Sequence, residues 1–149
     1  MKIQIIHLKR SNHLVEHSDQ VFNLSRSSEV PLFRALSNNY THLPLDRTRA
    51  KTQVKTVEEA VRMYEQDLKM RVMNGSKQKR LALRHLYDSC VLLNLQNKTI
   101  YFGCYCKCEI NPKKYDHVCH CDVLKRIILN KYNKSLKDGK KETVNEQDL

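Results

Sequence analysis

Five of the six cysteines in this 149-residue chain lie within eighteen consecutive positions, and this clustering constrains the fold more than any other feature. They form two groups, CYCKC at 104–108 and HVCHC at 117–121. The polar loop between the groups contains Asn111-Pro112, which favours a turn that folds the second group back onto the first. Thiolates and imidazoles brought together in this way suit Zn²⁺, which takes four sulfur or nitrogen ligands in a tetrahedron.

A single zinc ion would use four of the seven potential ligands in these two groups. Side chains two residues apart in a strand point the same way, which favours Cys-x-Cys pairs and turns His120 away unless the chain becomes helical there. A cluster of two zinc ions with bridging thiolates, or an iron–sulfur cluster, would use the same side chains. The preferred ligand set is Cys104, Cys106, Cys119 and Cys121, with Cys108 and His117 as the strongest substitutes.

The even number of cysteines would also suit disulfides, but clustered cysteines in a reducing compartment are more often metal ligands. Residues 1–10 have too short an apolar run for a signal peptide. No stretch approaches the roughly 20 apolar residues of a membrane span. We therefore expect an intracellular protein of the nucleus or cytoplasm.

The pattern predicts a mixed α+β fold that begins with a strand over residues 2–8. Residues 11–50 form an irregular segment, with a short helix at 31–36 opened by Pro31. Residues 44–55 are interpreted as a polar linker. The predicted organisation is an N-terminal segment at 1–50, a helical hairpin at 56–94, a zinc-binding module at 97–135 and a disordered tail at 138–149.

The hairpin is predicted from helical spacing of apolar residues on both sides of Asn74-Gly75. Thr56 and Glu59 match a capping box at the start of the first helix. Ser76 can cap the second helix, whose inner face carries Leu83, Leu86, Tyr87, Cys90 and Leu93. Cys90 is therefore interpreted as a buried apolar residue and not as a metal ligand.

The zinc-binding module is predicted to combine a strand at 99–102, the two cysteine groups and a final helix capped by Asp122. The order of strand, ligand pair, loop, ligand pair and helix is similar to that of treble-clef-like zinc modules. The likeness covers roughly residues 99–132 and concerns the architecture alone, because the ligand spacing departs from that pattern.

The positive charge of the chain is concentrated in its second half. Residues 69–141 contain 17 Lys or Arg against five Asp or Glu, whereas the whole chain carries a net charge of +11. A basic segment that also carries the cysteines predicts a nucleic-acid partner, RNA or DNA, bound without strong sequence preference. The side chains expected to contact it are Lys107, Lys113, Lys114, Lys125, Arg126 and Lys134, with Tyr105 and Tyr115 stacking on unpaired bases.

This sequence contains no recognisable catalytic motif. A zinc deaminase would need His-x-Glu and Pro-Cys-x-x-Cys, and neither is present. With only three glycines, glycine-rich phosphate-binding loops are not expected. The alternative function is a zinc-stabilised adaptor that binds another protein and has no nucleic-acid role, although the ligand spacing of RING domains is absent. Small size and a Lys-, Asn- and Ile-rich composition would suit a virus-encoded regulatory factor.

Overall fold

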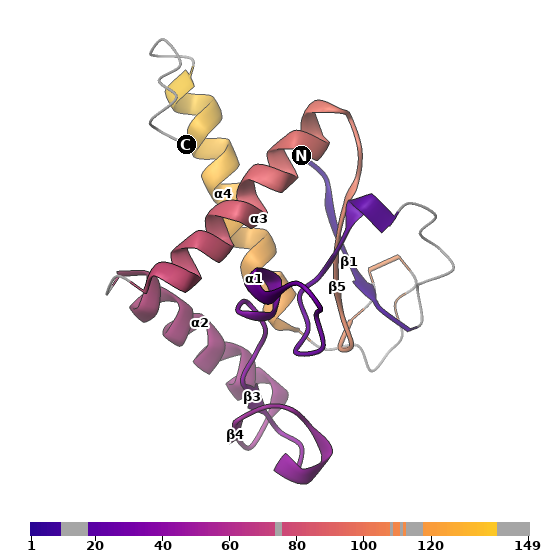
Figure 1. The fold of residues 1–149 in the computed structure, drawn as a ribbon, viewed down its shortest axis with the longest axis vertical. Helices are drawn as coiled ribbons and strands as arrows, with labels where there is room; N and C mark the ends of the chain where they lie inside the picture. Colours follow the sequence, from indigo (N-terminus) through magenta and orange to yellow (C-terminus); the bar gives the residue numbers. More distant parts are fainter. Residues whose placement is uncertain (10–17, 74–75, 108, 111, 113–117, 140–149) are drawn as a thin grey trace.

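The computed structural model describes residues 1–9, 18–73, 76–107, 109, 110, 112 and 118–139, without the side chains of 18 and 71–73. Within these ranges the chain has the predicted mixed α+β class, with α-helices packed around small parallel sheets (Figure 1). Predictions for Cys108, His117 and the last ten residues lie outside the described part. Among the described residues, no helix combines the length and apolarity needed to cross a bilayer.

The main sheet joins the start of the chain to the segment that leads into the cysteines. It has three strands in the order β1 (Ile3–His7), β5 (Ile100–Cys104) and β2 (Val21–Asn23), and both pairings are parallel. Ile3 pairs with Ile100, and His7 pairs with Cys104. β-Branched and aromatic residues favour this central strand, because they pack well on both faces of a covered parallel sheet. The first cysteine group therefore begins at the carboxyl end of the central strand.

Glycine at position 103 allows close packing beside this end of β5. A Cβ atom there would overlap the side chain of Leu8, which follows β1. The backbone N–H of Leu8 donates to the carbonyl of Cys104 at 2.8 Å, and the N–H of Leu24 donates to the carbonyl of Gly103 at 3.0 Å. The last residues of β5 are thus fixed from both neighbouring strands.

Two helices confirm the prediction for the middle of the chain, but they do not form an antiparallel hairpin. Figure 1 shows α2 (Val57–Met73) and α3 (Lys77–Leu95) diverging from their junction as a wide V. Thr56 accepts the N–H of Glu59 at 3.1 Å as predicted, while the Glu59 carboxylate accepts the N–H of Lys55 at 3.2 Å. The V leaves room for the final helix, which contacts both α2 and the sheet.

The last two helices end beyond the residues predicted from the sequence. α3 stops where Asn97 takes a left-handed conformation (φ 56°), and the N–H of Lys98 then donates to the carbonyl of Leu93 at 3.0 Å. α4 (His120–Gly139) begins before Asp122 and continues past Asp138, where the disordered tail was predicted to start. The middle of α4 is tied to α3, since Asn94 Nδ2 donates to the hydroxyl of Tyr132 at 2.9 Å.

The N-terminal segment is more ordered than its composition suggested. Besides β2 it contains a 3₁₀ turn, η2 (Ser18–Gln20), and the short helix α1 (Pro31–Arg34), which opens with proline as predicted. The supposed linker at 44–55 contains a second 3₁₀ turn, η3 (Leu45–Arg47), and strand β4 (Thr52–Gln53). β4 pairs in parallel with β3 (Tyr40–Thr41), so a polar composition did not imply an unstructured linker.

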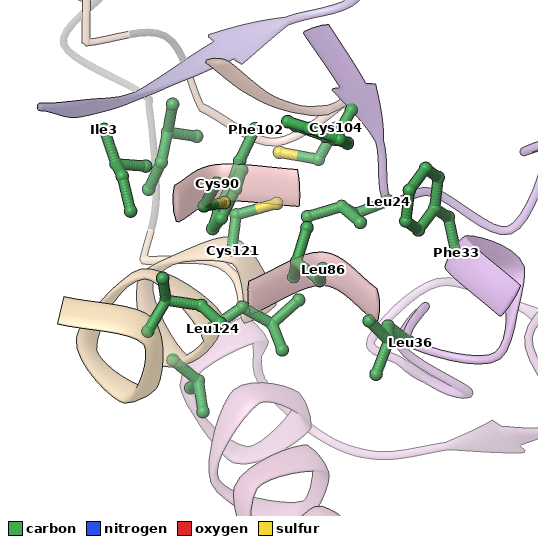
Figure 2. Close-up of a cluster of buried hydrophobic side chains, with 14 of the residues drawn as sticks. Ile3, Leu24, Phe33, Leu36, Leu86, Cys90, Phe102, Cys104, Cys121 and Leu124 are labelled. Atoms are coloured by element: carbon green, nitrogen blue, oxygen red, sulfur yellow. The ribbon is translucent and has the colours of Figure 1, made fainter. Parts of the chain in front are cut away.

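One hydrophobic core draws side chains from all three predicted segments. Figure 2 shows Phe102 of β5, Leu86 of α3 and Leu124 of α4 around the same interior as Leu24, which follows β2. On α3, Leu86, Tyr87, Cys90 and Leu93 are buried as predicted, whereas Leu83 is only partly buried. Cys104, Cys119 and Cys121 belong to this core, which means that the cysteine centre is built into the main interior of the protein.

Candidate metal centre

Three cysteines meet where β5 ends and α4 begins. Cys104 is the last residue of β5, Cys119 immediately precedes α4, and Cys121 lies in the first turn of α4. Their Sγ atoms all lie within 4.8 Å of one another, and the Sγ atoms of Cys104 and Cys119 are 3.4 Å apart. Sulfurs bound to one zinc ion at ~2.3 Å would lie roughly 3.8 Å from one another. The three side chains therefore fit a thiolate site for one metal ion.

Burial separates these three cysteines from solvent. Each is at most 1% exposed, and Figure 2 shows Cys104 and Cys121 beside Leu24 and Leu86 in the core. Apolar surroundings disfavour unpaired thiolate charge, whereas a bound cation would compensate it. Buried thiols that converge in this way are consequently suited to a metal that is held inside the fold.

The thiols already bias where negative charge would reside. Hydrogen bonds from Cys104 and Cys121 lower the pKa of Cys119 to about 5, because they stabilise its thiolate. Burial raises the pKa of Cys121 well above its usual value, and the hydrogen bonds to Cys104 and Cys119 act in the same direction. Negative charge in the centre is thus favoured at Cys119 over Cys121.

The start of α4 is fixed by Asp122, although not as the N-cap that was predicted. Asp122 is the third helical residue, and its Oδ2 accepts the backbone N–H of Cys119 at 2.8 Å. This is the reciprocal half of a capping box, in which the third residue satisfies the N–H of the N-cap. The helix begins earlier than predicted because Cys119 occupies the N-cap position, and the contact orients both cysteines of this turn.

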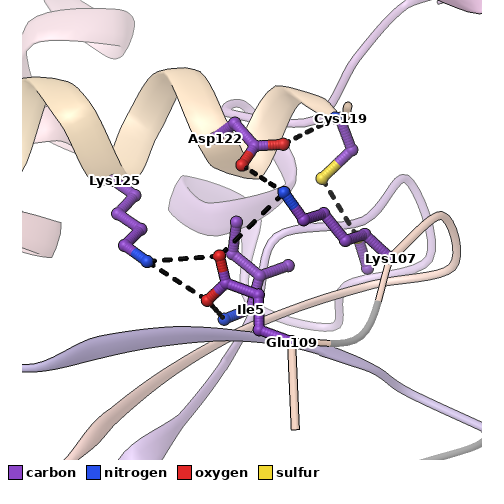
Figure 3. Close-up of polar contacts among 7 residues, drawn as sticks. Ile5, Lys107, Glu109, Cys119, Asp122 and Lys125 are labelled. Carbon is purple, nitrogen blue, oxygen red and sulfur yellow. Dashed lines mark hydrogen bonds and ion pairs between the residues drawn. The ribbon is translucent and has the colours of Figure 1, made fainter. Parts of the chain in front are cut away.

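Ion pairs attach the loop after β5 to α4 (Figure 3). Lys107 Nζ lies 2.8 Å from Asp122 Oδ1, and Lys125 Nζ lies 3.1 Å from Glu109 Oε2. The same Glu109 carboxylate accepts the backbone N–H of Ile5 at 2.9 Å, while the Glu109 N–H donates to the Ile5 carbonyl at 2.7 Å. The even-numbered residues of β1 use their backbone N–H and C=O groups to bond to β5. The backbone groups of Ile5 therefore point to the opposite edge of the sheet, where Glu109 bonds to them.

Cys106, the fourth member of the preferred ligand set, is exposed and does not belong to the group of three. It still lies next to the centre, because a hydrogen bond with the Cys104 thiol raises the pKa of Cys106 well above its usual value. The two substitute ligands, Cys108 and His117, fall outside the described residues. Of the four predicted ligands among the described residues, the structure thus brings together three.

His120 is a potential ligand of the second cysteine group that lies outside the preferred set. The helical turn carries it inward, where it is 6% exposed and its Nε2 lies 2.7 Å from the carbonyl oxygen of Leu24. The same nitrogen is 3.9 Å from Cys121 Sγ, and the ring of Tyr64 packs edge-on against the imidazole. Burial lowers the pKa of His120 to about 4, so the imidazole is neutral near pH 7. A helix predicted to start before Asp122 would have placed His120 on the inner side of the turn.

The residues predicted to contact nucleic acid are less available than their charge suggested. Lys107 and Lys125 form the ion pairs described above, and Arg126 pairs with Glu65 of α2. Lys134 is exposed on α4, and Tyr105 is exposed with its ring edge-on to His7 at 5.7 Å. The remaining predicted contacts lie outside the described residues: Lys113, Lys114 and Tyr115.

Comparisons of the chain with protein-family models, with curated proteins and with solved structures gave no match. A functional assignment therefore depends on the chemistry of the side chains described above.

Proposed function

We propose that this chain is a nucleic-acid-binding protein whose fold is stabilised by a structural Zn²⁺ ion. The observation that carries the metal is the convergence of three buried cysteine sulfurs within 4.8 Å. Thiolates favour zinc over magnesium or calcium, which prefer oxygen ligands. The ligands stand at the end of a strand and in the first turn of a helix, the order expected of a treble-clef-like module. Cys106, which already contacts Cys104, is the proposed fourth ligand.

Four protein ligands would leave no open position for water on the metal, which is typical of structural zinc. The proposed role of the ion is to hold the end of β5 against the start of α4. Lys107, Glu109 and Asp122 would support it from outside, because their contacts fix the same two elements. The proposed site is therefore not catalytic.

Native mass spectrometry of protein made in zinc-supplemented medium tests the metal. We expect about one Zn²⁺ per chain, removable with a chelator, in the wild type and in Cys90→Ser. Cys119→Ser and Cys121→Ser should lose the ion. Metal-free wild-type protein whose melting temperature is unaffected by chelator would contradict the proposal.

The nucleic-acid partner is supported by the net charge of +11 and by the second half of α4. There Lys131, Lys134 and Lys137 are all exposed, and the ~100° turn per residue places them within about 120° of the helix circumference. Exposed lysines aligned in this way can neutralise successive phosphates. The expected surface is thus shifted along α4, away from the lysine and arginine side chains that are paired with carboxylates.

Fluorescence anisotropy with a labelled single-stranded oligonucleotide tests this partner. Replacing all three lysines by glutamine should weaken binding and flatten its salt dependence, because each lost phosphate contact reduces the log–log slope by about 0.7 to 0.9. A matched set of Gln substitutions at Lys2, Lys51 and Lys55 controls for the change in net charge. Zinc-loaded, folded protein that binds no oligonucleotide at low salt would overturn the nucleic-acid function and favour the protein-binding adaptor.

A further inference from the structure

A cavity of about 840 Å³ opens beside the cysteine centre. It lies at the carboxyl ends of all three strands of the main sheet, since His7 ends β1, Ser25 follows β2 and Cys104 ends β5. His120, the first residue of α4, also lines it. In open parallel sheets, ligands bind in the crevice outside the carboxyl ends of the strands. The position of the cavity therefore marks it as a binding site, and its volume is typical of one.

Arginines give the cavity a positive rim. Arg47 and Arg49 are exposed around η3, and the half-buried Arg26 follows β2. Arg26 is anchored, because its Nη1 donates to the carbonyl of Asn38 at 2.7 Å. Among the described lining residues, Asp46 is the one acidic side chain. Arginine presents a planar fork of donors that matches phosphate oxygens, so this rim favours an anion.

Another part of the cavity lining is apolar. Val57, Ala60 and Val61 come from the first turns of α2, and Val118 precedes α4. Tyr105 adds an aromatic ring that is 46% exposed, and its hydroxyl lies 3.5 Å from Ser27 Oγ. A small inorganic anion would use the arginines alone and leave this part of the lining uncovered. The lining instead suits a ligand that joins an anionic group to a flat apolar body.

We propose that the cavity binds a nucleoside phosphate, with the phosphate at Arg26, Arg47 and Arg49 and the base against the apolar side chains of α2 or the ring of Tyr105. The ligand can be a free nucleotide or one unit of a single strand. This inference deepens the nucleic-acid function proposed above. It rests on that function where the ligand is one unit of a single strand. It assigns recognition of the base and the phosphate to a different place from the exposed lysines of α4.

Isothermal titration calorimetry of the zinc-loaded full chain tests the site with two probes, AMP and a short single-stranded oligothymidylate. The test variant is Arg47→Gln with Arg49→Gln, two exposed positions whose change should preserve the fold. Hydrogen bonds to charged groups contribute enough that losing two arginines should weaken binding of a probe about ten- to hundredfold. The matched control is Arg62→Gln with Arg84→Gln, which removes the same charge from exposed positions outside the cavity lining.

Each outcome decides between the two proposals. Loss of binding of either probe in the cavity variant, with the control variant near wild type, supports the nucleoside-phosphate site. AMP binding of this kind without oligonucleotide binding supports the site and overturns the nucleic-acid function. Binding of both probes that is equal in the cavity and control variants overturns the site, and the oligonucleotide binding then keeps the nucleic-acid function. Failure of both probes to bind overturns both proposals. If positive charge at position 26 were enough for binding, Arg26→Lys should bind the probes as the wild type does.

Discussion

The Sγ atoms of Cys104 and Cys119 lie 3.4 Å apart although fifteen residues separate the two cysteines in the chain. One belongs to the central strand of a parallel sheet and the other to the N-cap of the last helix. A metal at this point would join two elements that share the main hydrophobic core. Its removal should consequently affect the whole protein.

Cys121→Ser should abolish zinc-dependent stability. Structural zinc supplies folding free energy on the order of 10 kcal/mol in small modules, and here the ligands are part of a core that also includes Leu86 of α3. We expect one cooperative transition, lowered in temperature and no longer sensitive to chelator, measured by circular dichroism. Cys90→Ser is the control. A variant in which α2 and α3 melt separately at the wild-type temperature would show that the metal stabilises only residues 99–132.

Ile128→Ala should destabilise the protein more than Ile127→Ala. Ile128 is 1% exposed in the core, whereas Ile127 is only partly buried at its margin. Removing a fully buried isoleucine side chain costs about 2–5 kcal/mol, because apolar contacts are lost and a cavity remains. Urea denaturation of the two zinc-loaded variants measures the difference, and equal losses would mean that α4 packs with a different face.

Glu109→Ala should lower the free energy of unfolding by about 1–3 kcal/mol. The change leaves the N–H of Ile5 without its side-chain acceptor and removes the carboxylate that holds Lys125. Chemical denaturation measures the loss, with Glu29→Ala at an exposed position as the control. A double-mutant cycle with Lys125→Ala should give a coupling energy clearly different from zero; additive effects would contradict the ion pair.

Cys90 should resist alkylation until the protein unfolds. Burial raises the pKa of Cys90 from 9.0 to about 12, which leaves a thiolate fraction of about one in ten thousand at pH 8. Because the folded pKa lies above the unfolded pKa, the neutral thiol stabilises the native state below pH 9, and this contribution is lost as the pH rises toward 12. Iodoacetamide labelling followed by peptide mass spectrometry measures the rate; rapid native labelling would contradict the burial.

Local patterns predicted the helices of this protein well. Thr56 and Glu59 marked the start of α2, and helical spacing placed Tyr87 and Cys90 on the buried face of α3. The clustering of cysteines also predicted that Cys104 would meet Cys119 and Cys121. These features depend on residues close in sequence, or on a loop short enough to bring them together.

Long-range features could not be predicted in this way. Counting charges suggested a free basic surface, but Arg126 pairs with Glu65, which lies 61 residues earlier, and Lys125 pairs with Glu109 across the loop. The V-shaped arrangement of α2 and α3 depends on tertiary packing, because it is determined by the elements that lie between and beside the two helices. His120 was expected to face away because the group was treated as a strand, whereas the N-cap at Cys119 makes it helical.

Every strand pair of the main sheet involves β5, which is the last strand among the described residues. β1 and β2 emerge from the ribosome before β5, yet neither has its native neighbour until Ile100–Cys104 has been synthesised. Closing such distant pairings carries a large entropic cost and slows folding. β1 and β2 therefore stay unpaired during translation until the segment that carries Cys104 has been synthesised. Pairing with that segment completes the sheet.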